Sequence, residues 1–217
     1  ADQEMLRSRL RAYDPVGVSA TRLMTHNVQV DVINASMLIQ LPGPEQVYTA
    51  IEHGEEIALK SLNDSCLSPR VLRLRVGALV MFTKNEPAGA WVNGTTGEVI
   101  VLGSSHVEVQ IGGGGGIVTV NRDKWIILDH GDGNTSRILA SREQLPLKLA
   151  WALTIHKSQG ASLDRASIDL SRCFAPGQAY VALSRVRTLE GLNIEKWRGA
   201  NSVFAHPKVL EYERASR

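Results

Sequence analysis

Hydrophobic and polar positions along the chain follow two patterns. One is typical of alternating strands and helices, and the other is typical of short antiparallel strands. Residues 20–27 have the pattern of a strand that ends in a turn. Residues 28–41 repeat apolar side chains at helical spacing and are followed by Pro42 and Gly43, which predicts a helix ending there. The segments VYTAIEHG (47–54) and EEIALKSL (55–62) then favour one further strand and a short helix.

The pattern of residue types changes at Val71. From there to about residue 131, short β-branched runs are separated by Gly, Asn or Asp, which is typical of a small antiparallel sheet or barrel. The five consecutive glycines, residues 112–116, predict a flexible hairpin loop. After about Leu145 the alternation of strands and helices resumes. The pattern therefore predicts an α/β domain interrupted by a small β domain.

A polar island lies between two buried-looking segments in LAWALTIHKSQGASLDRASIDL, residues 149–170. A strand that stops at Thr154 places the following HKSQG at the carboxyl edge of a sheet, where α/β proteins bind ligands. Gly160 lets the backbone approach an anion closely, and Thr154, His156, Lys157 and Ser158 supply donors suited to phosphate. The alternative is a polar surface turn in which His156 caps a helix.

A second segment, PGQAYVALSRVRTLEGLNI (176–194), predicts a helix followed by a short strand, with Arg185 and Arg187 near the helix end. A guanidinium at the rim of a sheet is suited to spread the charge of a transferring phosphoryl group. The alternative is that both arginines are solvated and favour the helix dipole. Arg187 fits this alternative better than Arg185.

Composition narrows the class of protein. The 217 residues are 43% hydrophobic and 21% charged, as in ordinary globular proteins, and no apolar run reaches membrane-spanning length. The start of the chain lacks a signal-peptide pattern, so we expect an intracellular protein that is not secreted and has no membrane partner. Cys66 and Cys173 are too few for a disulfide framework and are predicted to be small buried side chains.

Charge is unevenly distributed. Residues 1–136 carry 11 basic and 15 acidic side chains, whereas residues 137–198 carry 10 basic and 5 acidic ones. The basic excess coincides with the HKSQG stretch. An anionic partner such as a nucleotide or a nucleic acid is consistent with this balance, and so is a solvated surface.

LAWALTIHKSQGASLD followed by FAPGQAYVALSRVRTLEGL closely resembles motifs V and VI of the PIF (petite integration frequency) helicases, in the RecD-like superfamily IB. TRLMTHNVQVDVINASML resembles the strand and helix that open the second RecA-like domain of that family. VGALVMFTKNEPAGAWVNGTTGEVIVL resembles the start of its SH3-like insert. The resemblance implies an α/β fold: a RecA-like lobe with a predominantly parallel sheet (1–76 and 146–217) interrupted by an SH3-like β-barrel (77–145).

The resemblance also implies a function and residue roles. The family's helicases use ATP and Mg²⁺ to move 5′ to 3′ on single-stranded DNA in repair, recombination or replication. Arg185 would be the arginine finger, and Gln159 and Gly160 would line the γ-phosphate side of the cleft. The implied DNA contacts are Thr154, His156, Lys157 and Ser158 in motif V, together with His26, Asn27, Lys84 and Asn93, for which a polar turn is an equal explanation.

The pattern G-x-x-x-x-G-K-S/T, which cradles phosphates, does not occur in the 217 residues. We therefore expect ATP and Mg²⁺ to be held by an N-terminal RecA-like domain that precedes this part, which acts as the C-terminal portion of a helicase in the nucleus or mitochondrion if the source is eukaryotic. The chain alone is expected to be inactive.

Two rival interpretations stay open. The chain is either part of an ATP-driven helicase or a non-catalytic nucleic-acid or protein interaction module that kept the fold. Exposed Trp91 and Trp125 could stack bases for such a module, although aromatic residues in a small barrel more often fill its core. Trp151 and Tyr180 are predicted to be core residues.

Overall fold

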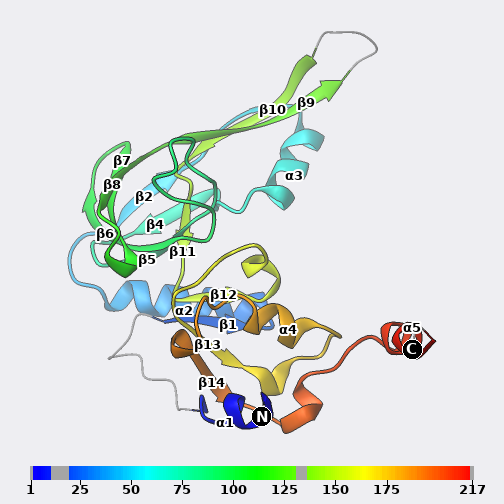
Figure 1. Ribbon diagram of the computed structural model, residues 1–217. Helices are drawn as coiled ribbons and strands as arrows, with labels where there is room; N and C mark the ends of the chain where they lie inside the picture. The colour runs from blue at the N-terminus through cyan, green and yellow to red at the C-terminus, as the bar shows by residue number, and fades with distance from the viewer. Residues whose placement is uncertain (1, 11–19, 131–135, 216–217) are drawn as a thin grey trace. The chain divides into compact units, whose positions relative to one another are not determined.

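The computed structural model describes residues 2–10, 20–130 and 136–215 (Figure 1). The described residues form two compact units, one within residues 1–36 and 150–217 and the other within residues 37–149. The first is an α/β unit around a parallel sheet, and the second consists mainly of antiparallel strands. This confirms the α/β class and the interruption by a β-rich segment.

The α/β unit is built on a four-stranded sheet in the order β12-β1-β13-β14, in which every neighbouring pair is parallel. Its helices and strands are α1 (Asp2–Arg7), β1 (Thr21–Met24), α2 (Asn27–Gln40, which extends into the second unit), β12 (Ala152–Thr154), β13 (Ala166–Asp169), α4 (Gln178–Leu183), β14 (Leu192–Lys196) and α5 (Pro207–Ala215). Short 3₁₀ turns lie at His156–Ser158, Leu170–Arg172, Leu189–Gly191 and Gly199–Ser202.

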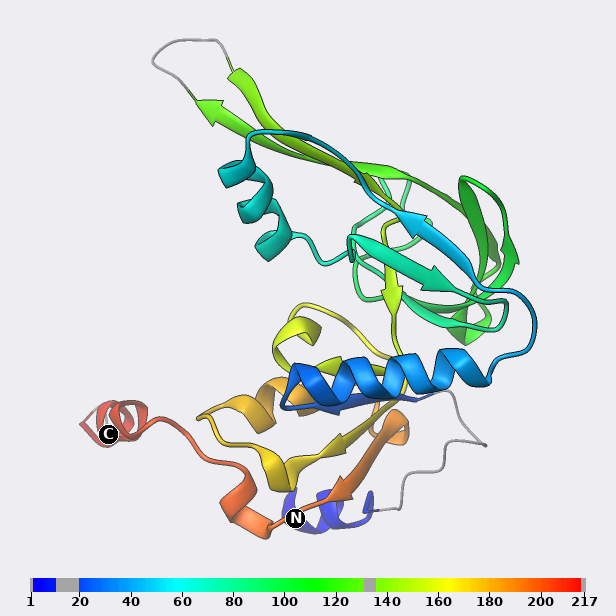
Figure 2. The ribbon, with the colours of Figure 1, turned by 180° about the vertical axis from the view of Figure 1, so that it is seen from behind.

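The parallel strands are apolar because helices cover both faces of the sheet. Leu23, Ile168 and Ile194 are almost fully buried, and Leu23 stands opposite Leu153 and Ile168 in the ladders. The crossover from β1 to β12 and the crossover from β13 to β14 run in opposite directions along the sheet. Right-handed crossovers then place α2 and α4 on opposite faces, as the two views show (Figures 1 and 2).

Asn34 anchors α2 to the sheet. Its side chain is buried and donates to the Ala152 carbonyl at 3.0 Å, while its amide oxygen accepts from the Ala152 N–H at 2.9 Å. Both main-chain groups of Ala152 are thereby satisfied by one side chain. Because β12 leads directly into HKSQG, this contact fixes the position of the polar island relative to α2.

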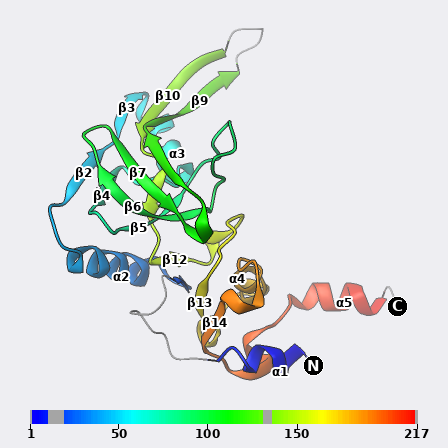
Figure 3. The same ribbon diagram turned by 60° about the vertical axis from the view of Figure 1, so that its left-hand side comes forward.

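The second unit contains three antiparallel sheets, in the orders β11-β5-β6-β7-β8, β3-β10-β9 and β2-β4 (Figure 3). Its elements are β2 (Gln46–Thr49), β3 (Ile51–Gly54), α3 (Glu56–Ser65), β4 (Val71–Leu74), β5 (Leu79–Phe82), β6 (Thr96–Leu102), β7 (His106–Ile111), β8 (Ile117–Asn121), β9 (Asp123–His130), β10 (Ser136–Gln144) and β11 (Leu147–Leu149). The glycine run lies between β7 and β8 and begins with a 3₁₀ turn, Gly112–Gly114, so the predicted hairpin is present.

This unit is wider than the predicted insert of residues 77–145, because residues 46–74 are bonded into it. β3 pairs with β10, and the Gln144 amide donates to the carbonyls of Tyr48, Pro69 and Arg70. The buried Tyr48 hydroxyl donates to the Gly103 carbonyl at 2.7 Å, and desolvation raises the pKa of this phenol. These bonds join the segment before Val71 to the strands after it.

Two predicted strands are each divided in the structure. VYTAIEHG forms β2 and β3, which belong to different sheets, with Ala50 bonded to the Arg70 carbonyl between them. LAWALTI divides at Ala150 and Trp151: Leu149 pairs antiparallel with Val80, whereas Ala152 pairs parallel with Arg22. Apolar content alone does not reveal which partner strand a segment will pair with.

Burial corrects two smaller predictions. Trp151 is buried as predicted, but Tyr180 is 71% exposed, so its assignment to the core was wrong. Cys66 and Cys173 are both only partly buried and free. Trp91 stacks on the buried Phe82, and Trp125 packs beside α3, so both indoles pack within the second unit and are partly buried.

Candidate functional site

The carboxyl ends of the parallel strands bring together three segments that are far apart in sequence. Because β1, β12 and β13 run parallel, the residues that follow them meet at one edge of the sheet. They are the segments 25–27, 155–160 and 170–174. The sequence-predicted residues of HKSQG and of the turn after the first strand therefore share this edge, as expected.

Two hydroxyl side chains, one just before HKSQG and one within it, bond to the main chain of the turn. Ser158 is fully buried and donates to the Ile155 carbonyl at 2.8 Å, and the buried Thr154 hydroxyl accepts from the Lys157 N–H at 3.2 Å. His156 and Lys157 are exposed. The two hydroxyls shape the turn, which presents the imidazole and the ammonium at the sheet edge.

Gln159 and Gly160 end the turn. Gly160 has φ +83°, and nothing lies within 4 Å of the place where a Cβ would stand. The glycine is thus required by its left-handed backbone and not by a crowded neighbour. Gln159 is exposed, with its N–H bonded to the His156 carbonyl at 3.1 Å. An open, exposed backbone bend of this kind fits close approach of an anion.

Arg185 is held by neutral acceptors. Its Nε donates to the Val181 carbonyl at 3.0 Å, Nη1 to the Ala161 carbonyl at 3.4 Å and Nη2 to the Ser184 hydroxyl at 2.9 Å. Among the residues that the structure describes, no carboxylate forms an ion pair with it. The guanidinium is therefore oriented without being neutralised.

Arg187 differs from Arg185 in this respect. It forms an ion pair with Asp164 at 3.1 Å, and both side chains are about half exposed. The main chain around both arginines is fixed, because Leu163 donates to the Arg185 carbonyl at 2.8 Å and accepts from the Arg187 N–H at 3.0 Å. The motif V and motif VI segments are thus bonded to each other, and only Arg185 keeps an uncompensated charge.

His26 and Asn27 lie at the same edge and are exposed, with Asn27 as the first residue of α2. The His26 imidazole stacks on Phe174, with ring centroids 5.5 Å apart and an interplanar angle of 5°. Sequence reasoning missed Phe174. An aromatic residue in the loop that leads to α4, where a residue is normally polar, was the signal that could have identified it.

Lys84 and Asn93 belong to the second unit and are engaged there. Lys84 forms an ion pair with Asp123 at 2.8 Å, donates to the Lys124 carbonyl and lies 5.2 Å from the ring centre of Trp125. The Asn93 N–H donates to the Asn85 side chain at 2.7 Å. Local contacts therefore account for Lys84, whereas the Asn93 side-chain oxygen is buried without a hydrogen-bond partner among the described residues. The predicted DNA role of both residues stays a prediction.

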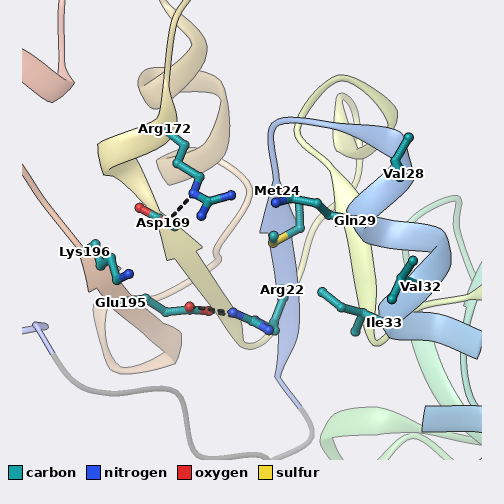
Figure 4. Close-up of a pocket in the computed structure, with 10 residues that line it drawn as sticks. All are labelled: Arg22, Met24, Val28, Gln29, Val32, Ile33, Asp169, Arg172, Glu195 and Lys196. Atoms are coloured by element: carbon teal, nitrogen blue, oxygen red, sulfur yellow. Dashed lines mark hydrogen bonds and ion pairs between the residues drawn. The ribbon is translucent and has the colours of Figure 1, made fainter. Parts of the chain in front are cut away.

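A groove of about 390 Å³ opens on the α2 face of the parallel sheet (Figure 4). One wall is apolar, formed by Met24, Val28, Val32 and Ile33. The other is charged, but Arg22 pairs with Glu195 at 2.7 Å and Arg172 with Asp169 at 3.4 Å. Both acids of this wall thus have arginine partners, and Lys196 lines the groove as well. Sequence reasoning did not identify this groove.

The described residues contain no group of three or more His, Cys, Asp or Glu side chains that could hold a metal ion. Burial, followed by the nearby Asp169 charge, raises the pKa of the Cys173 thiol to about 11, so this thiol stays protonated at neutral pH.

Comparison with known proteins identifies the family. Residues 58–102 match the family described as DNA helicase Pif1, 2B domain. The chain is 40% identical, over 97% of its length, to the ATP-dependent DNA helicase PIF1 of Xenopus laevis, and 39% identical, over 88%, to the Pif1 helicase of Bdellovibrio bacteriovorus. The chain belongs to the Pif1 helicase family. This confirms the resemblance drawn from HKSQG and QAYVALSR.

The Pif1 relatives are much longer than the chain, which spans 32% of the Xenopus protein and 42% of the Bdellovibrio protein. Solved structures agree with the fold. Bacteroides Pif1 in complex with ADP-AlF4 superposes with a TM-score of 0.86 at 29% identity, covering 99% of this chain and 49% of that one. Bacteroides Pif1 bound to single-stranded DNA covers the same shares with a TM-score of 0.72.

None of the described helices is long and apolar enough to cross a membrane. The SH3-like character of the insert stays a prediction, because the five-stranded antiparallel sheet and the Pif1 2B match do not define it.

Proposed function

We propose that the chain is the part of an ATP-dependent 5′ to 3′ DNA helicase that supplies the arginine finger and part of the grip on single-stranded DNA. The observation that carries this proposal is Arg185, whose guanidinium is oriented by three neutral acceptors and has no carboxylate partner among the described residues. A preorganised, uncompensated guanidinium stabilises charge on a transferring phosphoryl group better than one already paired.

The neighbouring residues take different roles in this proposal. Gly160 and Gln159 line the phosphate side of the cleft, because the backbone there is open and exposed. Lys157 and His156 contact the DNA backbone, together with His26 and Asn27. Thr154 and Ser158 hold the turn in shape, since both hydroxyls bond to the main chain within it. Lys84 is left out because contacts within the second unit account for it, and Asn93 is left out because its side-chain oxygen is buried.

ATP bound to the complete enzyme would supply the phosphoryl group that Arg185 acts on. The described residues fit one wall of such a site, with Arg185 and the Gly160 bend. We propose that a second, N-terminal RecA-like domain holds ATP and Mg²⁺. The Bacteroides relative was solved with ADP-AlF4, which is consistent with nucleotide use in this family.

We expect the isolated chain to bind single-stranded DNA weakly, with an affinity that depends on salt. We also expect it to have no ATP turnover of its own. Affinity for a dT oligonucleotide should fall with salt by a slope of about −0.7 per phosphate contacted. Lys157→Ala should reduce the magnitude of that slope by about 0.7, the contribution of one phosphate contact. Lys60→Ala, which removes an exposed lysine from α3 in the other unit, is the matched control and should leave the slope unchanged.

Two results would contradict the proposal. ATP turnover by the purified chain, stimulated by single-stranded DNA, would mean that it carries a complete nucleotide site. If the chain did not bind DNA even at low salt, the proposed DNA contacts at the sheet edge would be wrong.

A further inference from the structure

The His26–Phe174 pair is an exposed aromatic surface at the sheet edge. The rings are nearly parallel, at 5° and 5.5 Å, and Phe174 remains 59% exposed although its ring is large and apolar. The two residues come from the ends of different strands, since His26 follows β1 and Phe174 follows β13 and its 3₁₀ turn. The fold thus assembles one stacked pair from two distant segments.

The main chain beneath Phe174 is firmly held. The Gln178 side chain is 4% exposed, and its carbonyl oxygen accepts from the Phe174 N–H at 3.0 Å and from the Ala175 N–H at 3.4 Å. The next turn is fixed by the Gly177 N–H, which donates to the Phe204 carbonyl at 3.0 Å. An exposed ring on a fixed backbone loses little further freedom when a planar partner stacks on it.

The charges around this edge suit a partner that combines a flat ring with phosphate. His156 and Lys157 follow the neighbouring strand β12 and are exposed. Arg172, two residues before Phe174, has half of its side chain exposed but is paired with Asp169, so His156 and Lys157 are the main basic groups for phosphate. Aromatic faces beside basic side chains are the combination that binds nucleic-acid bases without strong sequence preference.

We propose that Phe174, supported by His26, stacks on a nucleobase. The ring supplies the apolar face, and the basic side chains at the same edge take the attached phosphates. The base comes either from single-stranded DNA or from the bound nucleotide, and both present the same planar chemistry. This inference rests on the proposed function and adds to it, since there His26 contacts only phosphate or sugar.

The test uses 2-aminopurine, whose fluorescence is quenched when it stacks on an aromatic ring. The 217-residue chain is titrated in one arm with a dT oligonucleotide carrying one central 2-aminopurine, and in the other arm with 2-aminopurine riboside triphosphate. Quenching is expected in at least one arm. Phe174→Ala should abolish it there and weaken binding between about fivefold and about a hundredfold, the effect of losing one base stack.

Three variants keep the result interpretable. Phe174→Leu preserves an apolar side chain but not the ring, and should lose quenching while its thermal unfolding stays close to wild type. Phe174→Trp should retain quenching. Tyr212→Ala removes another exposed aromatic side chain, on α5, and should change neither arm.

The outcomes separate this inference from the proposed function. If the chain binds DNA with its salt dependence intact but shows no quenching in either arm, or if Phe174→Leu quenches like wild type, the stacking role is wrong and the helicase proposal stands. If the chain binds neither probe, both fail. Quenching in the DNA arm alone assigns the base to the strand, and in the triphosphate arm alone to the nucleotide.

Discussion

The guanidinium of Arg187 lies 3.1 Å from the carboxylate of Asp164. Arg185, two residues earlier, is held instead by two carbonyls and a hydroxyl. The two arginines stand in the same short segment and carry the same charge, yet only one is compensated. The family resemblance implied Arg185 as the phosphate-directed residue, and this difference in partners gives that preference a physical basis.

Because the Arg187–Asp164 pair is about half exposed, we expect it to contribute little to stability. Asp164→Asn should lower the free energy of unfolding by less than about 1 kcal/mol, the usual range for surface ion pairs. Urea unfolding followed by circular dichroism measures this change. A loss of several kcal/mol would show that the pair holds the two motif segments together.

Arg142 in β10 is 1% exposed, and its guanidinium bonds to Glu52 and Asn63. Glu52→Ala would leave this charge without its carboxylate partner, which typically costs about 3–5 kcal/mol. Arg137→Ala is the matched control, because Arg137 pairs with Glu55 in an exposed ion pair, and it should cost less than about 1 kcal/mol. Equal effects of the two changes in urea unfolding would refute the role assigned to burial.

Gly54 is required by close packing as well as by its backbone. Its φ is +127°, and a Cβ there would lie 2.2 Å from the Leu139 carbonyl oxygen. Gly54→Ala should therefore destabilise the second unit by well over the roughly 1–2 kcal/mol that a left-handed backbone alone costs. Gly89→Ala tests that smaller cost separately, because Gly89 has φ +83° and open space. The midpoint temperature of thermal unfolding should be clearly lower for Gly54→Ala than for Gly89→Ala.

The Cys173 thiol should react slowly with alkylating reagents at neutral pH. Burial raises its pKa to about 11, so the protonated form persists and at pH 8 only about one thiol in a thousand is the reactive thiolate. In a Cys66→Ser background, the iodoacetamide reaction rate should rise about tenfold per pH unit between pH 8 and 10. A plateau below pH 9 would contradict the raised pKa.

The parallel sheet was predictable because its strands are short apolar runs followed by polar turns, as at Leu153 and Thr154. The helix through Asn34 followed from apolar spacing and the Pro42–Gly43 stop. The division of LAWALTI at Trp151 was not predictable, since it depends on which strand each half pairs with. The exposure of Tyr180 likewise depends on the direction in which a short helix faces, which two turns of sequence do not define.

Part of the candidate site could be predicted and part could not. Residue types drew attention to Arg185 and Gly160, because charge and backbone freedom belong to the residue itself, and the family resemblance implied their roles, which stay predictions. The burial of Ser158 and the engagement of Lys84 could not be read in this way, since both depend on partners far away or on the turn's own geometry. Phe174 could not be identified as a candidate from the sequence, because its stack with His26 forms only when the fold brings the two residues together.

The most direct test of the account is DNA-stimulated ATP turnover by Arg185→Ala in the longer protein that includes a phosphate-binding domain. We expect kcat to fall about a thousandfold or more, while affinities for ATP and single-stranded DNA stay nearly unchanged. Arg185→Lys should restore little, because an ammonium cannot replace the planar guanidinium, and Arg187→Ala should cost much less. A near-normal kcat in a folded Arg185→Ala variant would contradict the arginine-finger role.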